Sequence, residues 1–273
     1  GLAAGILTMG TGLGLSILGL VLPYVMVQFG SEGWRYAWFL LGIAVFALSF
    51  VCRALLRDHP EEKGTSMYGG LEEVRARTSV GFFSAWREVA REKEIWKLGV
   101  VYFMFGFSYI IYVTFFVAYL TSEAALTPQK AGQIFALLGL ASIMSGALWG
   151  SLSDGLGRRR GSLLAYLTVA LSFLLIAAWR SPTGAYVSSI VFGLSMSSIP
   201  AIMAAAVGDS VGGRLAPAAL GLITLIFGIG QSLGPAVAGW IKDATGTFAW
   251  AFILCTVVSL TGAACSLLLR KRS

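Results

Sequence analysis

Long apolar runs alternate with short polar segments along almost the whole chain. Eight of the runs reach or approach the ~20 residues that a helix needs to cross ~30 Å of hydrocarbon. Because lipid offers the backbone no hydrogen-bond partners, runs of this length are predicted to be helices. They cover residues 2–29, 35–56, 96–120, 130–152, 161–179, 184–208, 216–241 and 247–269.

One polar segment, residues 58–94, is much longer than the others. Its second part places Phe82, Trp86 and Val89 four and three residues apart among several arginines. This spacing is typical of an amphipathic helix that lies in the headgroup plane. We expect the segment to tether two membrane-embedded halves, and a regulatory lipid-binding element is the alternative.

Two of the apolar runs share an internal repeat. Residues 5–16 read GILTMGTGLGLS, and residues 221–232 read GLITLIFGIGQS, with shared Gly, Thr and Ser positions at an offset of 216. The next runs also match, because residues 37–38 and 249–250 are both Ala-Trp. Two consecutive matching helices in the same order indicate a duplicated bundle, as in transporters built from parallel repeats.

The repeat predicts how the chain is organised. We expect a parent of twelve spans in two six-helix halves, truncated before its fifth helix, so that eight spans are present here. Residues 1–57 are then the last two helices of an N-terminal bundle, residues 58–94 a cytoplasmic linker with an amphipathic helix, and residues 95–273 a C-terminal six-helix bundle. The predicted fold class is an all-α polytopic membrane protein.

Composition agrees with this class. Apolar residues make up 57 % of the chain and charged residues 12 %, about half the charged fraction of an ordinary soluble domain. The mean hydropathy is +0.80. The net charge of +7 does not indicate nucleic acid binding, because the bases lie between apolar runs rather than on one soluble face.

The chain offers no catalytic or metal-binding constellation. Cys52, Cys255 and Cys265 lie inside apolar runs, without a spacing that would hold a metal. The single histidine, His59, lies in the polar linker. No nucleotide-binding loop and no nucleophile with an adjacent base is present. The sequence therefore predicts neither an enzyme nor a protein with a cofactor or a metal.

The bases are distributed unevenly over the two sides of the predicted bundle. If the linker side is cytoplasmic, sixteen of the twenty Lys and Arg residues lie there. The other four are Arg35, Lys130, Arg180 and Lys242. Positive charge is enriched in cytoplasmic loops, so we expect a multi-pass protein of the plasma (cell inner) membrane with both ends of this chain cytoplasmic.

A charged motif occupies the turn between runs 130–152 and 161–179. It reads GSLSDGLGRR from Gly150 to Arg159. This motif resembles the signature of the major facilitator superfamily (MFS), which lies in the cytoplasmic turn between the second and third helices of a half. The stretch GQSLGPAVAG, residues 230–239, is similar to that family's Gly-x-x-x-Gly-Pro gating helix. The resemblance covers the chain except the linker and implies an MFS-type helical bundle.

The resemblance also implies roles for these residues. The signature turn contributes a conformational latch formed by Gly150, Asp154, Gly157, Arg158 and Arg159. We expect Asp154 either to face the N-terminus of the helix near residues 215–217 or to pair with an arginine. Flexing or sliding of gating helices during alternating access is predicted for Gly12, Gly14, Gly228, Gly230, Gly234 and Pro235. Static close packing is the alternative for these glycines.

Polar and aromatic side chains at membrane depth are the candidates for a solute cavity. Five aromatic residues of run 96–120 step by three and four positions and so share one helical face. Gln231 is polar at apolar depth and needs a partner. The predicted cavity residues are Tyr109, Tyr112, Ser195 and Gln231. Packing of the aromatic stripe and of the serines against other helices is the alternative.

The predicted function is a monomeric MFS permease that moves a small organic solute across the lipid bilayer by alternating access. Proton-coupled export of amphipathic compounds is the first candidate, with protons as the candidate coupling ion. Uptake of organic acids or sugars by symport is the alternative within transport. A receptor or structural subunit that keeps the fold without transporting is the alternative of another class.

Overall fold

The computed structural model describes residues 2–57, 64 and 82–270. Most of the predicted linker, residues 58–63 and 65–81, lies outside the described part. The regular elements among the described residues are all helices, and these residues include no strand. The helices are α1 (Leu2–Phe29), η1 (Gly30–Glu32), α2 (Gly33–Leu55), α3 (Phe82–Arg91), α4 (Lys93–Ser122), α5 (Pro128–Ser142), α6 (Ser145–Leu156), α7 (Arg158–Ala178), α8 (Pro182–Ser195), α9 (Ser198–Thr245) and α10 (Ala249–Ser266).

Six stretches of the described chain are long and apolar enough to cross a membrane. The sequence predicts eight crossings, and the difference arises in the two longest stretches. Met9–Leu55 contains 47 residues and Pro182–Thr245 contains 64, more than twice and about three times the ~20 residues that one crossing needs. The first is interrupted by η1 and the second by Gly212, whose φ of 71° and ψ of 172° are not helical.

The chain forms two compact units, residues 1–20 with 82–273 and residues 21–81. These limits differ from the predicted domains, because the first part of α1 belongs with the large unit. Glycines explain the difference: a Cβ on Gly12 would lie 2.8 Å from the carbonyl oxygen of Gly139, and one on Gly19 would lie 2.6 Å from the amide nitrogen of Ala136. Close backbone approach of this kind is how small residues join helices in membranes.

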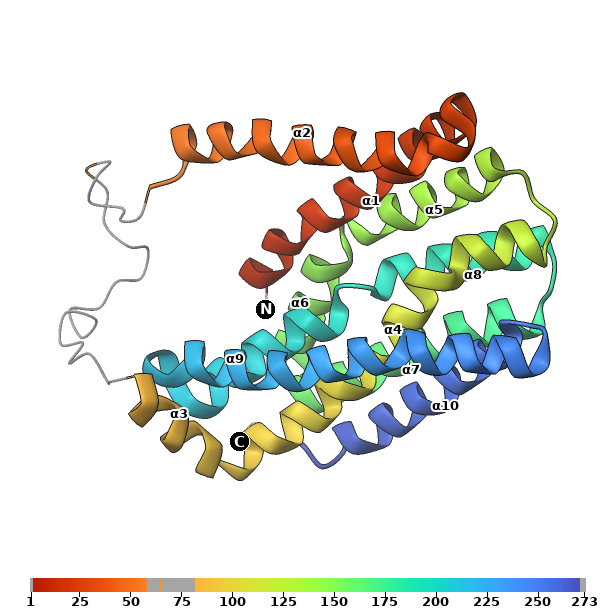
Figure 1. Ribbon diagram of the computed structural model, residues 1–273. Coiled ribbons are helices and arrows are strands. Elements are labelled where there is room, and N and C mark those ends of the chain that lie inside the picture. Colours follow the sequence, from red (N-terminus) through yellow and green to blue (C-terminus); the bar gives the residue numbers. More distant parts are fainter. Residues whose placement is uncertain (1, 58–63, 65–81, 271–273) are drawn as a thin grey trace. The chain divides into compact units, whose positions relative to one another are not determined.

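The large unit is a bundle in which helices far apart in the sequence lie side by side. The contacts between α4 and α9, between α7 and α10, and between α4 and α10 are the most extensive (Figure 1). Its core contains a cluster of aromatic rings around Tyr112, which lies 4.3 Å from Phe192, 5.4 Å from Phe173 and 5.8 Å from Phe252 between ring centroids. Rings at such distances add to the packing energy of the core.

The amphipathic helix predicted after residue 81 is present as α3. Val89 is buried against the bundle, and Trp86 is half-buried. The Glu88 carboxylate accepts a hydrogen bond from Arg214 of α9 at 2.8 Å. The apolar side of α3 therefore packs at least partly on protein, and its placement in the headgroup plane stays a prediction.

Candidate solute site and signature turn

The polar contact between Tyr109 of α4 and Gln231 of α9 links two of the predicted cavity residues. The Gln231 Nε2 donates to the Tyr109 hydroxyl at 2.5 Å. Both side chains are half-buried. The Tyr109 ring stacks on Phe105 at 5.0 Å and on Phe227 at 5.8 Å between centroids. The pair thus combines hydroxyl and amide groups with a wall of aromatic faces.

Glycines bring α4 and α9 close enough for this contact. A Cβ on Gly230 would lie 2.7 Å from the Phe103 carbonyl oxygen, and a Cβ on Gly234 would lie 2.6 Å from the Phe107 carbonyl oxygen. Since real Cβ atoms essentially never lie so close to backbone atoms, only glycine fits at these two positions. The two backbones therefore touch on both sides of Gln231, which fixes it opposite Tyr109.

The other two predicted cavity residues lie elsewhere. Tyr112 is fully buried, and its hydroxyl lies 2.7 Å from the Ser188 hydroxyl in the core between helices. Ser195 is also fully buried and donates to the carbonyl oxygen of Val191 in its own helix at 2.9 Å. These environments are those of packing residues, so we do not include Tyr112 and Ser195 in the solute site.

The signature turn joins α6 to α7 through a single residue, Gly157. Its φ of 85° and ψ of 154° lie in a region that residues with a Cβ rarely adopt. Gly150 is buried within α6. Because α7 begins at the next residue, Arg158, the chain reverses direction here without a longer loop. The glycine of the motif is therefore explained by backbone geometry alone.

Arg158 joins three side chains at this turn. Its Nη1 lies 2.6 Å from Asp154 and 2.7 Å from the Ser153 hydroxyl, while its Nε lies 2.8 Å from Asp209 of α9. The Arg158 side chain is only 12 % exposed. Of the two partners expected for Asp154, the structure shows the arginine. Arg159 and Arg160, unlike Arg158, have no ion pair among the described residues.

Asp209 is a member of this cluster that sequence reasoning missed. It lies three residues before the non-helical Gly212, at the end of the first half of α9. The signal was present, because Asp209 is the only acid between residues 155 and 242. An isolated acid at the end of an apolar run needs a cationic partner, and the signature turn supplies one.

The residues predicted to gate the bundle fall into two groups. Gly12, Gly230 and Gly234 face another helix at backbone contact, whereas a Cβ on Gly14 or Gly228 would meet nothing within 4 Å. Gly228 lines an open groove of about 660 Å³. The groove is bounded by Trp86, Gly221, Thr224, Leu225, Gly228, Ile229, Ser232 and Leu233. Pro235 lies inside α9.

Among the described residues, charge is kept out of the core and no metal centre is formed. No buried side chain there is charged, and the buried hydroxyl groups come from Ser, Thr and Tyr. The same residues hold no group of three or more His, Cys, Asp or Glu that could bind a metal ion. The chemistry available inside the bundle is therefore hydrogen bonding by neutral groups and contact with aromatic rings.

Several curated transporters resemble the chain. It is 24 % identical over 258 residues to a probable sulfoacetate transporter SauU of Cupriavidus necator, covering 90 % of this chain and 60 % of the relative. It is 26 % identical over 271 residues to monocarboxylate transporter 12 of Xenopus laevis, covering 93 % and 58 %. A putative tartrate transporter of Agrobacterium vitis is 24 % identical over 260 residues, covering 89 % and 56 %. The chain thus spans less than two thirds of the length of these relatives.

A solved structure has the same fold. It is an inward-facing, unoccupied bacterial homolog of the human lysosomal transporter Spinster, with a TM-score of 0.68 at 17 % identity, over 98 % of this chain and 70 % of that one. The profile of the family described as "Uncharacterised MFS-type transporter YbfB" matches residues 3–267. The chain therefore belongs to this family of MFS transporters, which are membrane proteins and not enzymes.

Proposed function

We propose that this chain is the larger part of a secondary transporter that moves small organic acids across a membrane by alternating access. The observation that carries the proposal is the Tyr109–Gln231 pair, held between two helices and bordered by aromatic rings. When Gln231 Nε2 donates to the Tyr109 hydroxyl, the Tyr109 O–H and the second N–H of Gln231 remain free to donate to a solute. Carboxylate and hydroxyl oxygens are the acceptors that such donors fit.

The named relatives favour organic acids over the other solute classes. Proteins similar to this chain are named for sulfoacetate, monocarboxylates and tartrate, all of which carry acid groups. Export of amphipathic compounds, the first candidate from the sequence, has no such support. Since no charged side chain is buried among the described residues, we propose that this part of the protein contributes neutral donors and that the countercharge for the acid lies elsewhere.

Flux into proteoliposomes tests the proposal. The full-length protein is expected to take up at least one of sulfoacetate, lactate and tartrate faster than protein-free vesicles. An amphipathic cation such as ethidium serves as the competing solute. Transport of ethidium with no flux of any acid would favour export of amphipathic compounds. Binding of an acid without any flux would favour a non-transporting receptor.

Changes at the solute pair are expected to weaken transport selectively. Tyr109→Phe and Gln231→Leu each remove one hydrogen-bonding partner, which is worth about 1 kcal/mol or roughly a fivefold change in apparent affinity. The double variant should lose less than the product of the two single effects, because both variants break the same contact. The matched control is Tyr186→Phe, an exposed tyrosine of α8. Equal KM values for wild type, the two single variants and the double variant would remove the pair from the solute site.

The internal repeat supports the proposal that the transporter has further helices. Gly12 and Ser16 of α1 pack on α5, where a Cβ on Gly139 would lie 2.6 Å from the Ser16 hydroxyl. The positions related to them by the offset of 216, Gly228 and Ser232, line the open groove on α9 instead. We propose that a helix equivalent to α5, from the N-terminal half, fills this groove. Two crossings in each of the longest apolar stretches then give eight here and twelve in all.

This arrangement predicts a context-dependent effect of Gly228→Leu. In the chain of residues 1–273 the variant is expected to leave thermal stability unchanged, because a Cβ at Gly228 meets nothing within 4 Å. In the full-length protein the same leucine should lower stability by about 2 kcal/mol, because overpacking a helix contact costs about that much. Thermal unfolding in detergent measures both. No effect in the full-length protein would mean that the groove is open to lipid.

The membrane orientation is also part of the proposal. In the predicted topology sixteen of the twenty basic residues lie on the linker side, which supports cytoplasmic placement of both chain ends and of the signature turn in the plasma membrane. The ion pairs of Arg158 with Asp154 and Asp209 support a latch role for that turn. Single cysteines placed at positions 160 and 181 test the orientation by labelling from outside the cell. We expect labelling at position 181 alone, and labelling at position 160 alone would show the opposite orientation.

A further inference from the structure

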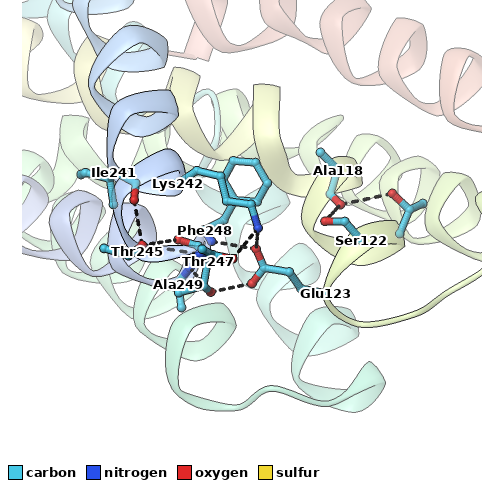
Figure 2. A network of polar contacts seen from close by, with 11 residues as sticks. Ala118, Ser122, Glu123, Ile241, Lys242, Thr245, Thr247, Phe248 and Ala249 are labelled. Atoms are coloured by element: carbon cyan, nitrogen blue, oxygen red, sulfur yellow. Dashed lines mark hydrogen bonds and ion pairs between the residues drawn. The ribbon is translucent and has the colours of Figure 1, made fainter.

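A second polar cluster lies at the other end of the bundle, opposite the signature turn along the helices. Glu123, at the C-terminal end of α4, receives one hydrogen bond from the last turn of α9 and two from the turn between α9 and α10 (Figure 2). Lys242 Nζ donates to Oε1 at 2.7 Å, the Thr247 hydroxyl to Oε2 at 2.6 Å, and the Phe248 backbone N–H to Oε1 at 2.8 Å. We call these four residues the Glu123 clasp.

The clasp is well enclosed for a group of charges at a helix end. The side chains of Glu123 and Lys242 are 18 % and 28 % exposed. Lys242 Nζ also lies 4.8 Å from the centre of the Phe248 ring, over its face, and the Phe248 ring stacks on Phe115 of α4 at 4.9 Å. Partial burial makes such an ion pair stronger than an exposed one, because less water screens it.

The charges of the clasp match helix ends only in the folded bundle. A carboxylate at the C-terminal end of its own helix is unfavourable, since that end carries partial negative charge. Glu123 instead accepts the backbone N–H at the positive N-terminal end of α10, beginning at Ala249. Lys242 lies in the last turn of α9 and donates to the Gly246 carbonyl oxygen at 2.7 Å. One ion pair therefore stabilises the ends of three helices at once.

The clasp joins the same two helices that carry the proposed solute pair. Tyr109 lies 14 residues before Glu123 on α4, and Gln231 lies 11 residues before Lys242 on α9. These separations correspond to about 21 Å and 16 Å along the helices. Gly234, which lies between Gln231 and Lys242 on α9, touches the α4 backbone at Phe107, two residues before Tyr109. The contact between α4 and α9 is thus fixed at several positions along the helices. The ion pair between Glu123 and Lys242 lies at the C-terminal ends of both helices.

We propose that the Glu123 clasp sets the register of α4 against the second half of α9, and that Glu123 and Lys242 are positioning residues for the Tyr109–Gln231 site. The inference rests on the proposed function of that site. The two helices then move as one unit during transport, rather than sliding past each other at Gly230 and Gly234. Loss of the clasp lets the helix ends separate and misaligns the donors that face the solute.

Titration of the clasp gives it a defined pH range. Burial raises the pKa of Glu123, but the hydrogen bonds from Lys242, Thr247 and the Phe248 N–H outweigh burial and hold the pKa below its ordinary value of 4.5. The titratable groups that interact with Glu123 include Lys242 of α9 and Tyr119 of α4, and Arg180 interacts with Tyr119 in turn. A lowered pKa stabilises the fold above the unfolded-state value, and this stabilisation is lost as the pH falls through the folded-state value.

The test variant is Glu123→Gln, which keeps the shape of the side chain and removes its charge. Its first readout is independent of transport: cysteines at positions 109 and 231, in a protein whose native cysteines are replaced by alanine, are cross-linked in membranes with a short bifunctional methanethiosulfonate. We expect the cross-linking rate to fall roughly fivefold, as for the loss of a charge-assisted hydrogen bond. In the Glu123→Gln variant that keeps Tyr109 and Gln231, the apparent KM for the transported acid should rise by a similar factor.

Matched variants separate positioning from general stability. Glu88→Gln breaks another ion pair to α9, the one with Arg214 at 2.8 Å, and should change neither readout. Thr247→Val removes one hydrogen bond of the clasp. It serves as the test variant if the Glu123→Gln protein does not fold. The difference in stability between wild type and Glu123→Gln should be constant from about pH 8 to pH 5 and shrink below about pH 4.5.

The possible outcomes are distinct. A lower melting temperature for Glu123→Gln, with unchanged cross-linking and unchanged KM, would overturn the positioning role and leave a purely structural ion pair. Unchanged cross-linking in both clasp variants would also overturn it. If wild type transports none of the acids, the proposed function fails, and the cross-linking rates still decide whether the clasp sets the register of α4 and α9.

Discussion

Replacing Gly230 by leucine is expected to lower the free energy of unfolding by about 3 kcal/mol, the upper end of the usual cost of overpacking a core. A Cβ at this position would lie 2.7 Å from the Phe103 carbonyl oxygen and 2.9 Å from the Phe107 amide nitrogen. Both are backbone atoms of α4, so no side chain can rotate away to make room. The helices must separate, and the Tyr109–Gln231 hydrogen bond should break with them. Thermal unfolding in detergent measures the effect.

The matched control is Gly239→Leu in the same half of α9. A Cβ on Gly239 would meet nothing within 4 Å, and leucine favours a helix over glycine by up to about 1 kcal/mol. This variant should therefore be neutral or slightly more stable. A similar loss of stability for both variants would show that the cost at Gly230 does not arise from its contact with the α4 backbone.

Replacing Arg158 by glutamine is expected to cost about 1–2 kcal/mol, between the values for exposed and buried ion pairs. The arginine is largely enclosed, whereas its partners Asp154 and Asp209 are 41 % and 44 % exposed. Without the arginine, two carboxylates from different helices remain close together with no shared cation. We expect the turn between α6 and α7 to separate from the end of the first half of α9.

Stability and cysteine labelling near residues 154 and 209 measure this separation. Arg160→Gln, at an exposed position of the same turn, is the control and should change neither quantity. If Arg160→Gln and Arg158→Gln have equal effects, the arginines act through net positive charge at the membrane surface. In that case the latch interpretation of the signature turn is wrong.

The chain's own hydropathy and spacing were sufficient for the class of protein and for the course of its helices. Continuous apolar runs near 20 residues leave helix as the only backbone form that satisfies its hydrogen bonds in lipid. The signature motif and the repeat led to the MFS, which the family match over residues 3–267 confirms. These properties depend on local composition, so no knowledge of tertiary contacts was needed to find them.

The candidate site was only partly predictable. Periodicity placed Tyr109 and Tyr112 on one helical face, but two side chains three residues apart still point about 60° away from each other around the helix axis. That difference directs Tyr112 into the core beside Ser188, while Tyr109 meets Gln231. Likewise, five glycines and one proline were grouped as gating residues, yet Gly230 touches another backbone and Gly228 does not. Sequence cannot distinguish these cases, because whether a glycine lies against another backbone depends on how the helices pack.

The sequence by itself determined a polytopic helical membrane protein of the MFS, with a charged turn at Asp154 and Arg158. Only the tertiary structure decided which charges meet: Arg158 with Asp209, and Glu123 with Lys242. The partners in these two pairs lie 51 and 119 residues apart in the chain. The physical reason is that hydropathy is a property of each segment, whereas an ion pair depends on how helices pack, which is fixed by backbone contacts at a few glycines between distant segments.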